Sequence, residues 1–140
     1  MNITVSTVVE RPVAAVWRWY AVEHVRNHPR WDPDMELEQI SNRPIGLGTR
    51  IRRRNTHFGQ PIDGEMEIVE WEPERVMGTR ISDANADTMG RATFEPLGPT
   101  ATRITIEADF PNLDPAKVDQ LRPLLERTAA NVRRLLEADT

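Results

Sequence analysis

The densest group of side chains that could bind an anion or a nucleic acid is the set of arginines at residues 50 and 52–54. Further along, acidic and apolar residues alternate over residues 63–68, so in an extended chain they point to opposite faces. One hairpin register satisfies these charges by pairing Arg54 with Asp63, Arg52 with Glu65 and Arg50 with Glu67. The sequence therefore predicts a solvated cross-strand charge ladder here rather than a binding site.

Arg53 is the exception in this group, because it shares a face with Ile51 and so points toward the interior. A buried charge must find a partner. Arg53 is therefore the first candidate for a functional residue, and snorkelling of its side chain to a cavity mouth is the alternative. Arg80 and Arg91 could supply further polar groups, but a single bulge reverses the face on which they lie.

The three histidines do not match a known metal-binding motif. His24 and His28 have the i, i+4 spacing of a zinc-binding helix, but Val25 stands where a metalloprotease has glutamate, and Pro29 interrupts the helix. We expect a local structural or surface role for both, and an exposed loop position for His57. A His–carboxylate catalytic pair is geometrically possible. No serine lies in a nucleophile elbow and no stretch resembles a phosphate loop, so we predict neither a metal nor a cofactor.

Large rings and thioethers form the third chemically distinctive group. They are Trp17, Tyr20, Trp31, Phe58, Trp71, Phe94 and Phe110, with Met35, Met66, Met77 and Met89. For any one of them, ordinary core packing is the simpler interpretation. Together they are typical of a pocket for a small apolar molecule, since rigid aromatic surfaces lie beside adaptable side chains.

The elements that must position these groups follow from hydrophobic periodicity. Residues 3–9 predict a strand, residues from Pro12 predict a short helix with an aromatic face, and residues 24–35 predict an irregular helical turn and loop. Six further strands are predicted at residues 36–41, 49–55, 62–71, 76–82, 88–95 and 101–109, with turns between them, including one at residues 83–87. Because no helix interrupts these strands, they predict an antiparallel meander.

The segment from Asp114 to Ala138 predicts one long amphipathic helix. Its apolar positions recur at spacings of three and four: Val118, Leu121, Leu125, Thr128, Val132 and Leu135. Asp114 is a suitable N-cap, and Pro115 is favourable at the first helical position. Pro123 removes an internal hydrogen bond, so we expect a kink or break near residues 119–123.

Several short motifs in this order resemble those of the polyketide cyclase/dehydrase and lipid-transport superfamily. They are residues 11–17 (RPVAAVW), 28–34 (HPRWDPD), 46–50 (GLGTR) and 71–75 (WEPER). The resemblance covers nearly the whole chain. It implies an α+β helix-grip (START-like) fold, in which a curved antiparallel sheet of about seven strands wraps the C-terminal helix and encloses a hydrophobic cavity, with two short helices after the first strand. The superfamily includes carriers, receptors and cyclases, so the fold does not choose a function.

Composition narrows the remaining function classes. The 140 residues, 39% of them hydrophobic, predict one domain over residues 1–140. A net charge of -4 and a pI near 5.4 argue against a nucleic-acid partner. The absence of cysteine excludes disulfides and thiolate chemistry. Neither a signal peptide nor a membrane-spanning segment is predicted, so we expect a cytoplasmic protein.

The leading hypothesis is a protein that binds or carries a small hydrophobic ligand, lipid-like or polycyclic, between the sheet and the long helix. The alternatives are an enzyme of the aromatase/cyclase type and a homodimeric or partner-binding module without a ligand. The predicted cavity residues are Trp17, Tyr20, Trp31, Ile51, Arg53, Met66, Met77, Phe94, Ile104, Ile106, Leu121 and Leu125.

Overall fold

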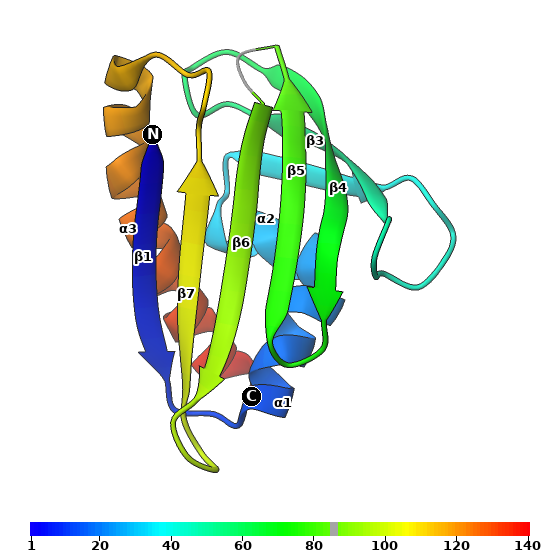
Figure 1. Ribbon diagram of the computed structural model, residues 1–140, viewed down its shortest axis with the longest axis vertical. Helices are drawn as coiled ribbons and strands as arrows, with labels where there is room; N and C mark the ends of the chain where they lie inside the picture. The colour runs from blue at the N-terminus through cyan, green and yellow to red at the C-terminus, as the bar shows by residue number, and fades with distance from the viewer. Residues whose placement is uncertain (85–86) are drawn as a thin grey trace.

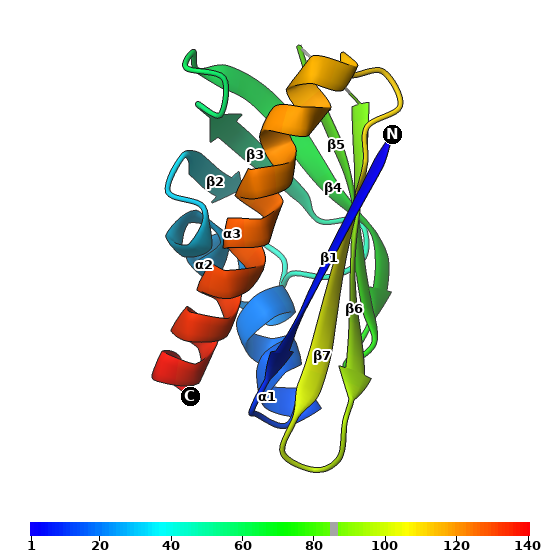
Figure 2. The ribbon, with the colours of Figure 1, turned by 90° about the vertical axis from the view of Figure 1, so that its left-hand side faces the viewer.

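A seven-stranded antiparallel sheet curves around one long helix in the computed structural model, which describes residues 1–84 and 87–140 (Figures 1 and 2). The strands are β1 (Asn2–Val9), β2 (Met35–Gln39), β3 (Arg50–Asn55), β4 (Ile62–Glu72), β5 (Val76–Asp83), β6 (Asp87–Pro96) and β7 (Thr102–Asp109). Their order in the sheet is β1-β7-β6-β5-β4-β3-β2. The first and last strands of the chain are therefore neighbours.

The helices all lie on the concave side of the sheet (Figure 2). They are α1 (Val13–Trp17), the π-helical turn η1 (Arg18–Val22), α2 (His24–Trp31) and α3 (Pro115–Asp139). This is the predicted helix-grip fold, and each predicted strand is present with its ends within two residues of the prediction. The turn expected at residues 83–87 includes residues 85 and 86, which lie outside the described residues.

The predicted hairpin register is confirmed: Arg50 lies opposite Glu67, Arg52 opposite Glu65 and Arg54 opposite Asp63. The ion pairs follow this register only in part. Arg54 Nε contacts Asp63 Oδ1 at 2.8 Å, but Arg50 reaches diagonally to Glu65 at 3.1 Å, and Arg52 contacts Glu38 of β2 at 3.1 Å. All of these side chains are exposed, so each pair stabilises the sheet by less than about 1 kcal/mol.

Polar contacts hold the helices after β1 against the C-terminal half of α3. The Asp139 carboxylate accepts hydrogen bonds from Trp19 Nε1 at 2.8 Å and from Arg30 Nη1 at 2.5 Å. Asn131 Nδ2 donates to the carbonyl oxygen of Trp31 at 3.1 Å. These contacts come from residues more than ninety positions apart in the chain, and they position Trp31 beside α3.

The predicted break in the long helix is wrong: α3 runs without interruption from Pro115 to Asp139, with Pro123 inside it. Asp114 caps it as predicted, accepting a hydrogen bond from Ala116 N at 2.9 Å. Pro123 and Asp119, whose carbonyl oxygen loses its usual partner, are both exposed, so water can hydrate that carbonyl. The opposite face is buried through Val118 and Leu121, and this packing keeps the helix continuous.

Replacing Pro123 by alanine tests this explanation. We expect Pro123→Ala to raise the free energy of unfolding by about 1–3 kcal/mol, because the helix regains a hydrogen bond and loses a steric conflict, partly offset by greater freedom of the unfolded chain. Urea denaturation measures the change. The exposed neighbour Gln120 provides a control, since Gln120→Ala should alter stability by less than about 0.5 kcal/mol. A loss of stability in Pro123→Ala would contradict the explanation.

Candidate functional site

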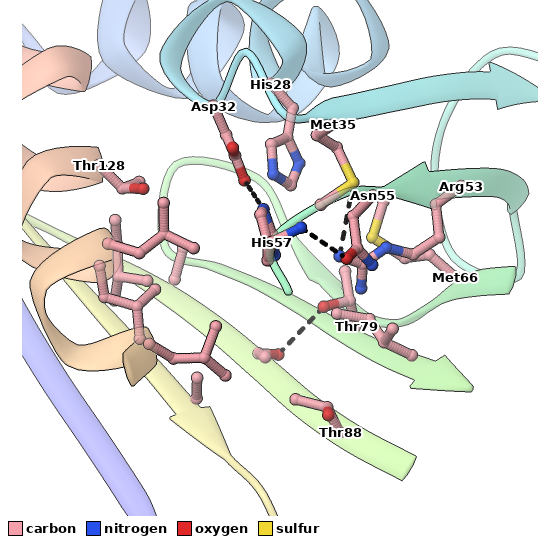
Figure 3. Close-up of a pocket in the computed structure, with 18 of the residues that line it drawn as sticks. His28, Asp32, Met35, Arg53, Asn55, His57, Met66, Thr79, Thr88 and Thr128 are labelled. Carbon is pink, nitrogen blue, oxygen red and sulfur yellow. Dashed lines mark hydrogen bonds and ion pairs between the residues drawn. The ribbon is translucent and has the colours of Figure 1, made fainter. Parts of the chain in front are cut away.

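A cavity of about 180 Å³ lies between the inner face of the sheet, α2 and the N-terminal half of α3 (Figure 3). Its apolar lining comes from Met35, Phe58, Ile62, Met66, Met77, Ile81, Ala92, Ile106, Ala108, Phe110, Leu113, Leu121, Leu124 and Leu125. Its polar groups include Tyr20, His24, His28, Asp32, Arg53, Asn55, His57, Thr79, Asp83, Thr88 and Thr128. A cavity of about 150 Å³ can hold a benzene ring, so this one has room for a ring-sized molecule.

The cavity exists because α3 contacts the sheet through two separate core clusters. The cluster near its C-terminus includes Val132 and Leu136, and the cluster near its N-terminus includes Val118 together with Ile3 and Phe110. Each cluster fixes the distance between helix and sheet at its own end. The inner face of the central strands is left incompletely covered between them.

Eight of the twelve predicted cavity residues line this space: Tyr20, Trp31, Arg53, Met66, Met77, Ile106, Leu121 and Leu125. The other four, Trp17, Ile51, Phe94 and Ile104, are buried elsewhere. A role in ligand binding stays a prediction for the eight that line the cavity.

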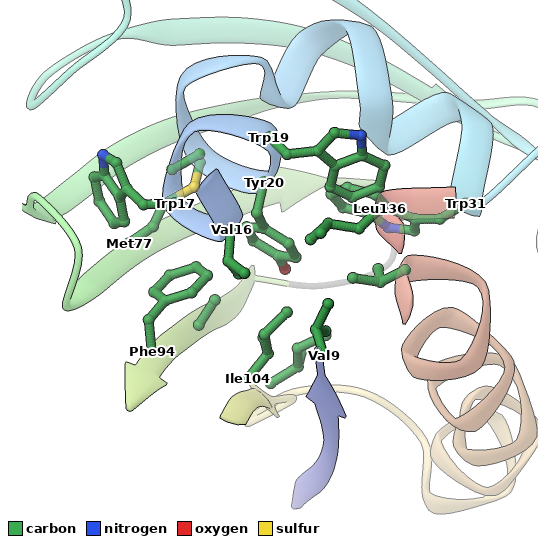
Figure 4. Close-up of a cluster of buried hydrophobic side chains, with 14 of the residues drawn as sticks. Val9, Val16, Trp17, Trp19, Tyr20, Trp31, Met77, Phe94, Ile104 and Leu136 are labelled. Carbon is green, nitrogen blue, oxygen red and sulfur yellow. The ribbon is translucent and has the colours of Figure 1, made fainter. Parts of the chain in front are cut away.

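Trp17, Phe94 and Ile104 belong to the core cluster at the end of the sheet that α1 covers (Figure 4). The Trp17 ring packs edge-on against Phe94, with ring centroids 5.4 Å apart, and against Trp71 at 4.9 Å. Phe94 and Ile104 are cross-strand partners, so both lie on the inner face, as predicted, but at the filled end. Ile51 is fully buried opposite Met66.

Arg53 extends from β3 into the cavity (Figure 3), as its alternation with Ile51 predicted. Only 8% of its surface is exposed. Its Nη2 lies 3.4 Å from the thioether sulfur of Met35, and its Nε is buried without a hydrogen-bond partner in the described structure. Burial lowers the pKa of Arg53, and the nearby carboxylates of Asp83 and Asp32 act in the opposite direction.

His24 and His28 form a short hydrogen-bonded chain along α2. His24 Nδ1 lies 2.9 Å from the carbonyl oxygen of Tyr20, and His28 Nδ1 lies 2.9 Å from His24 Nε2. The His28 ring stacks on Trp31, with centroids 4.9 Å apart. Burial lowers the pKa of His24 to about 4. Burial also lowers the pKa of His28 well below its usual value, and positive charge on His24, Arg53 and His57 acts in the same direction. Both imidazoles are therefore neutral at neutral pH.

His57 was predicted to be exposed, and that prediction is wrong. Its side chain is 11% exposed and its Nε2 lies 2.7 Å from Oδ2 of Asp32, whose side chain is 5% exposed. The two residues meet because the connection after β3 folds back over the end of α2. A carboxylate that holds an imidazole in this way fixes its orientation and tautomer. The sequence allowed a His–carboxylate pair but contained no pattern that joined these two positions.

Arg80 and Arg91, whose facing was open, both lie on the outer face of the sheet. Arg91 Nε contacts Glu70 Oε1 there at 3.1 Å. Thr79 and Ala92, their neighbours in sequence, are buried on the inner face. Among the arginines of the described strands, Arg53 is therefore the one whose side chain is buried at the cavity.

The sequence profile of one family, polyketide cyclase/dehydrase and lipid transport, matches residues 1–138. The chain belongs to this family. No curated protein matches the sequence at a significant level. The family match confirms the resemblance drawn from the short motifs.

Solved structures share the fold at low sequence identity. A START superfamily protein from Mycobacterium smegmatis superimposes with a TM-score of 0.82 at 15% identity, over 99% of both chains. The Zhui aromatase/cyclase from Streptomyces sp. R1128 gives 0.75 at 16%, over 99% of this chain and 92% of the other. Norcoclaurine synthase from Thalictrum flavum, solved with dopamine and hydroxybenzaldehyde, gives 0.73 at 16%, over 100% and 88%. At these identities the comparison supports the fold alone.

The described residues contain no group of histidine and acidic side chains arranged to hold a metal ion. Their helices include none that is long and apolar enough to cross a membrane.

The buried histidines make stability depend on pH. Because the pKa of His24 is about 4 in the folded protein and near 6.5 when unfolded, the unfolded chain binds more protons between these values. Stability should therefore fall as the pH decreases from about 6.5 to 4, by about 3 kcal/mol from His24 alone. Urea denaturation over this range measures the slope.

The His24→Gln variant keeps a donor for the Tyr20 carbonyl but cannot titrate. We expect the free energy of unfolding of this variant to depend less steeply on pH than that of the wild type. The two slopes should differ by about 1.4 kcal/mol per pH unit over this window. The surface variant Gln120→Ala should retain the wild-type slope. Equal slopes for wild type and His24→Gln would show that His24 is not held neutral in the folded protein.

Proposed function

We propose that this protein binds a small hydrophobic ligand in the cavity between the sheet and α3. The observation that carries the proposal is a largely apolar space, enclosed on opposite sides by Leu121 and Leu125 of the helix and by Met66 and Ile106 of the sheet. Small-molecule sites are typically of this kind, apolar with a few convergent polar groups. The chain belongs to a family whose description names polyketide cyclases and lipid transport, and this membership supports the proposal.

The volume of the cavity limits the size of the ligand that it can hold. About 180 Å³ suits a molecule of one or two rings. A long lipid-like chain or a larger polycycle requires the cavity to widen. The thioethers of Met35, Met66 and Met77 are the side chains best able to move, because an unbranched side chain can adopt several shapes at little cost.

A second candidate is an enzyme of the aromatase/cyclase type, and the polar groups at the cavity favour it. Burial raises the pKa of Tyr20, so its hydroxyl stays protonated and can donate a hydrogen bond. Arg53 could stabilise an oxygen that gains negative charge during a reaction. Turnover of a short poly-β-ketone that is lost in Tyr20→Phe, with ligand binding retained, would support this candidate over simple binding.

Filling the cavity tests the proposed function directly. Leu125 lines the cavity, and Arg127 lies on the exposed face of the same helix. We expect Leu125→Trp to weaken binding of toluene or naphthalene by at least about tenfold, a loss of roughly 1.4 kcal/mol, since the larger ring occupies the ligand's space. The matched variant Arg127→Trp should bind like wild type. Ligand-observed NMR titration measures both, and equal effects of the two variants would contradict the proposal.

A further inference from the structure

Arg53 is a buried cation whose capacity to donate hydrogen bonds is largely unused within the described structure. A guanidinium carries five N–H groups. One of them reaches the sulfur of Met35, which is a weak acceptor, and Nε has no partner. On β4 the residue directly opposite Arg53 is Gly64, which has no side chain. A buried donor without an acceptor is costly, and an anionic oxygen in the cavity would supply one.

Two carboxylates lie near Arg53, and the Nε of its guanidinium is still without a hydrogen-bond partner in the described structure. Asp32 is already hydrogen-bonded to His57 at 2.7 Å. The charges of Asp83 and Asp32 both favour the protonated guanidinium of Arg53. Asp83 also lines the cavity, opposite Gly64 on the neighbouring strand, whereas Thr79 and Thr88 are uncharged.

The hydrogen bonds of His24 and His28 determine whether the nitrogen that His28 presents to the cavity is a donor or an acceptor. A carbonyl oxygen can only accept, so His24 Nδ1 carries the proton that bonds to Tyr20. His24 is neutral, and its Nε2 is therefore an acceptor. His28 Nδ1 must then donate to it. Since His28 is also neutral, its Nε2 bears a lone pair, and this nitrogen can only accept a hydrogen bond.

The side chains of Arg53 and His28 point toward the same part of the cavity. Figure 3 shows Arg53 from β3 and His28 from α2 pointing toward the same part of the cavity, near Asn55 and His57. Their proximity also appears in the electrostatics, because the charge of Arg53 contributes to the lowered pKa of His28. The apolar residues Leu121 and Leu125 of α3 and Ile106 of β7 line the same cavity.

We propose that Arg53 and His28 form a two-point polar subsite that selects ring-sized hydrophobic acids carrying a hydroxyl group, an inference that rests on the proposed function. Arg53 donates to the anionic oxygen of the ligand, and His28 Nε2 accepts from its hydroxyl. The ring of the ligand lies against the apolar wall. A hydroxylated aromatic carboxylate is the simplest molecule with these three features.

A panel of single-ring probes separates these contributions at neutral pH: toluene, benzoate and the three hydroxybenzoate isomers, titrated by calorimetry or NMR. We expect benzoate to bind at least about tenfold more tightly than toluene, and one hydroxybenzoate isomer to bind at least about tenfold more tightly than benzoate. Arg53→Met should remove the advantage of benzoate over toluene. His28→Phe, which keeps the ring contact with Trp31, should remove only the hydroxyl advantage. Arg52→Met, on the outer face of the same strand, is the control and should change neither.

The outcomes separate this inference from the proposed function. If no probe binds, toluene included, the proposed function itself fails. If toluene binds but the acids bind no better, or if their advantage survives Arg53→Met, the subsite is overturned and the proposed function stands.

A measurement on the wild-type protein covers the case in which a variant does not fold. Imidazole ¹⁵N resonances should show His28 Nε2 unprotonated in the free protein and shifted on binding the preferred hydroxybenzoate but not benzoate. A protonated Nε2, or an unchanged resonance, would overturn the role of His28.

Discussion

The cavity depends on a geometric constraint: one helix of 25 residues is held against a curved sheet at both ends. Val132 and Leu136 pack into one core cluster, and Val118 and Leu121 pack into the other. Neither cluster can move toward the sheet without compressing the other end, since protein interiors are closely packed and resist strain. The middle of the sheet therefore remains incompletely covered. The contacts of Asp139 with Trp19 and Arg30 reinforce this arrangement by tying α2 to the end of α3.

The polar wall of the cavity is unusual for a space that is otherwise apolar. Burying an arginine and three histidines costs free energy unless each finds hydrogen-bond partners. The histidines have such partners within the protein: His24 and His28 in the chain that begins at the Tyr20 carbonyl, and His57 at Asp32. Arg53 is less well satisfied. A site that keeps such a group has a physical reason to bind an acceptor, and this is why the chemistry of the cavity centres on β3.

The sequence predicted the fold well because its information is local. Strict alternation marks the strands, and alternation also placed Arg53 and Met66 on the inner face, where the structure has them. The division of that inner face between core and cavity is not local. Phe94 and Ile106 have the same sequence pattern and belong to the same core cluster, and only the position of the helices decides that Ile106 also lines the cavity. Pro123 was misjudged for a related reason, because its cost was offset by packing on the far side of α3.

The site's histidines show the same limit. The spacing of His24 and His28 was visible and pointed to a shared helix face, but their role in a hydrogen-bonded chain depends on the carbonyl oxygen of Tyr20 in the π-helical turn η1. The pairing of His57 with Asp32 joins residues 25 positions apart and has no periodic signature. Long-range pairs of this kind require the folded backbone before they can be recognised.

The most direct test of a ligand site between sheet and helix is to locate a bound probe by intermolecular nuclear Overhauser effects in methyl-labelled protein. The account predicts contacts from an aromatic probe to the methyl groups of Leu121, Leu125, Ile106 and Met66, which line the cavity from both sides. Contacts confined to exposed methyl groups such as those of Ile40 and Leu47 would contradict it.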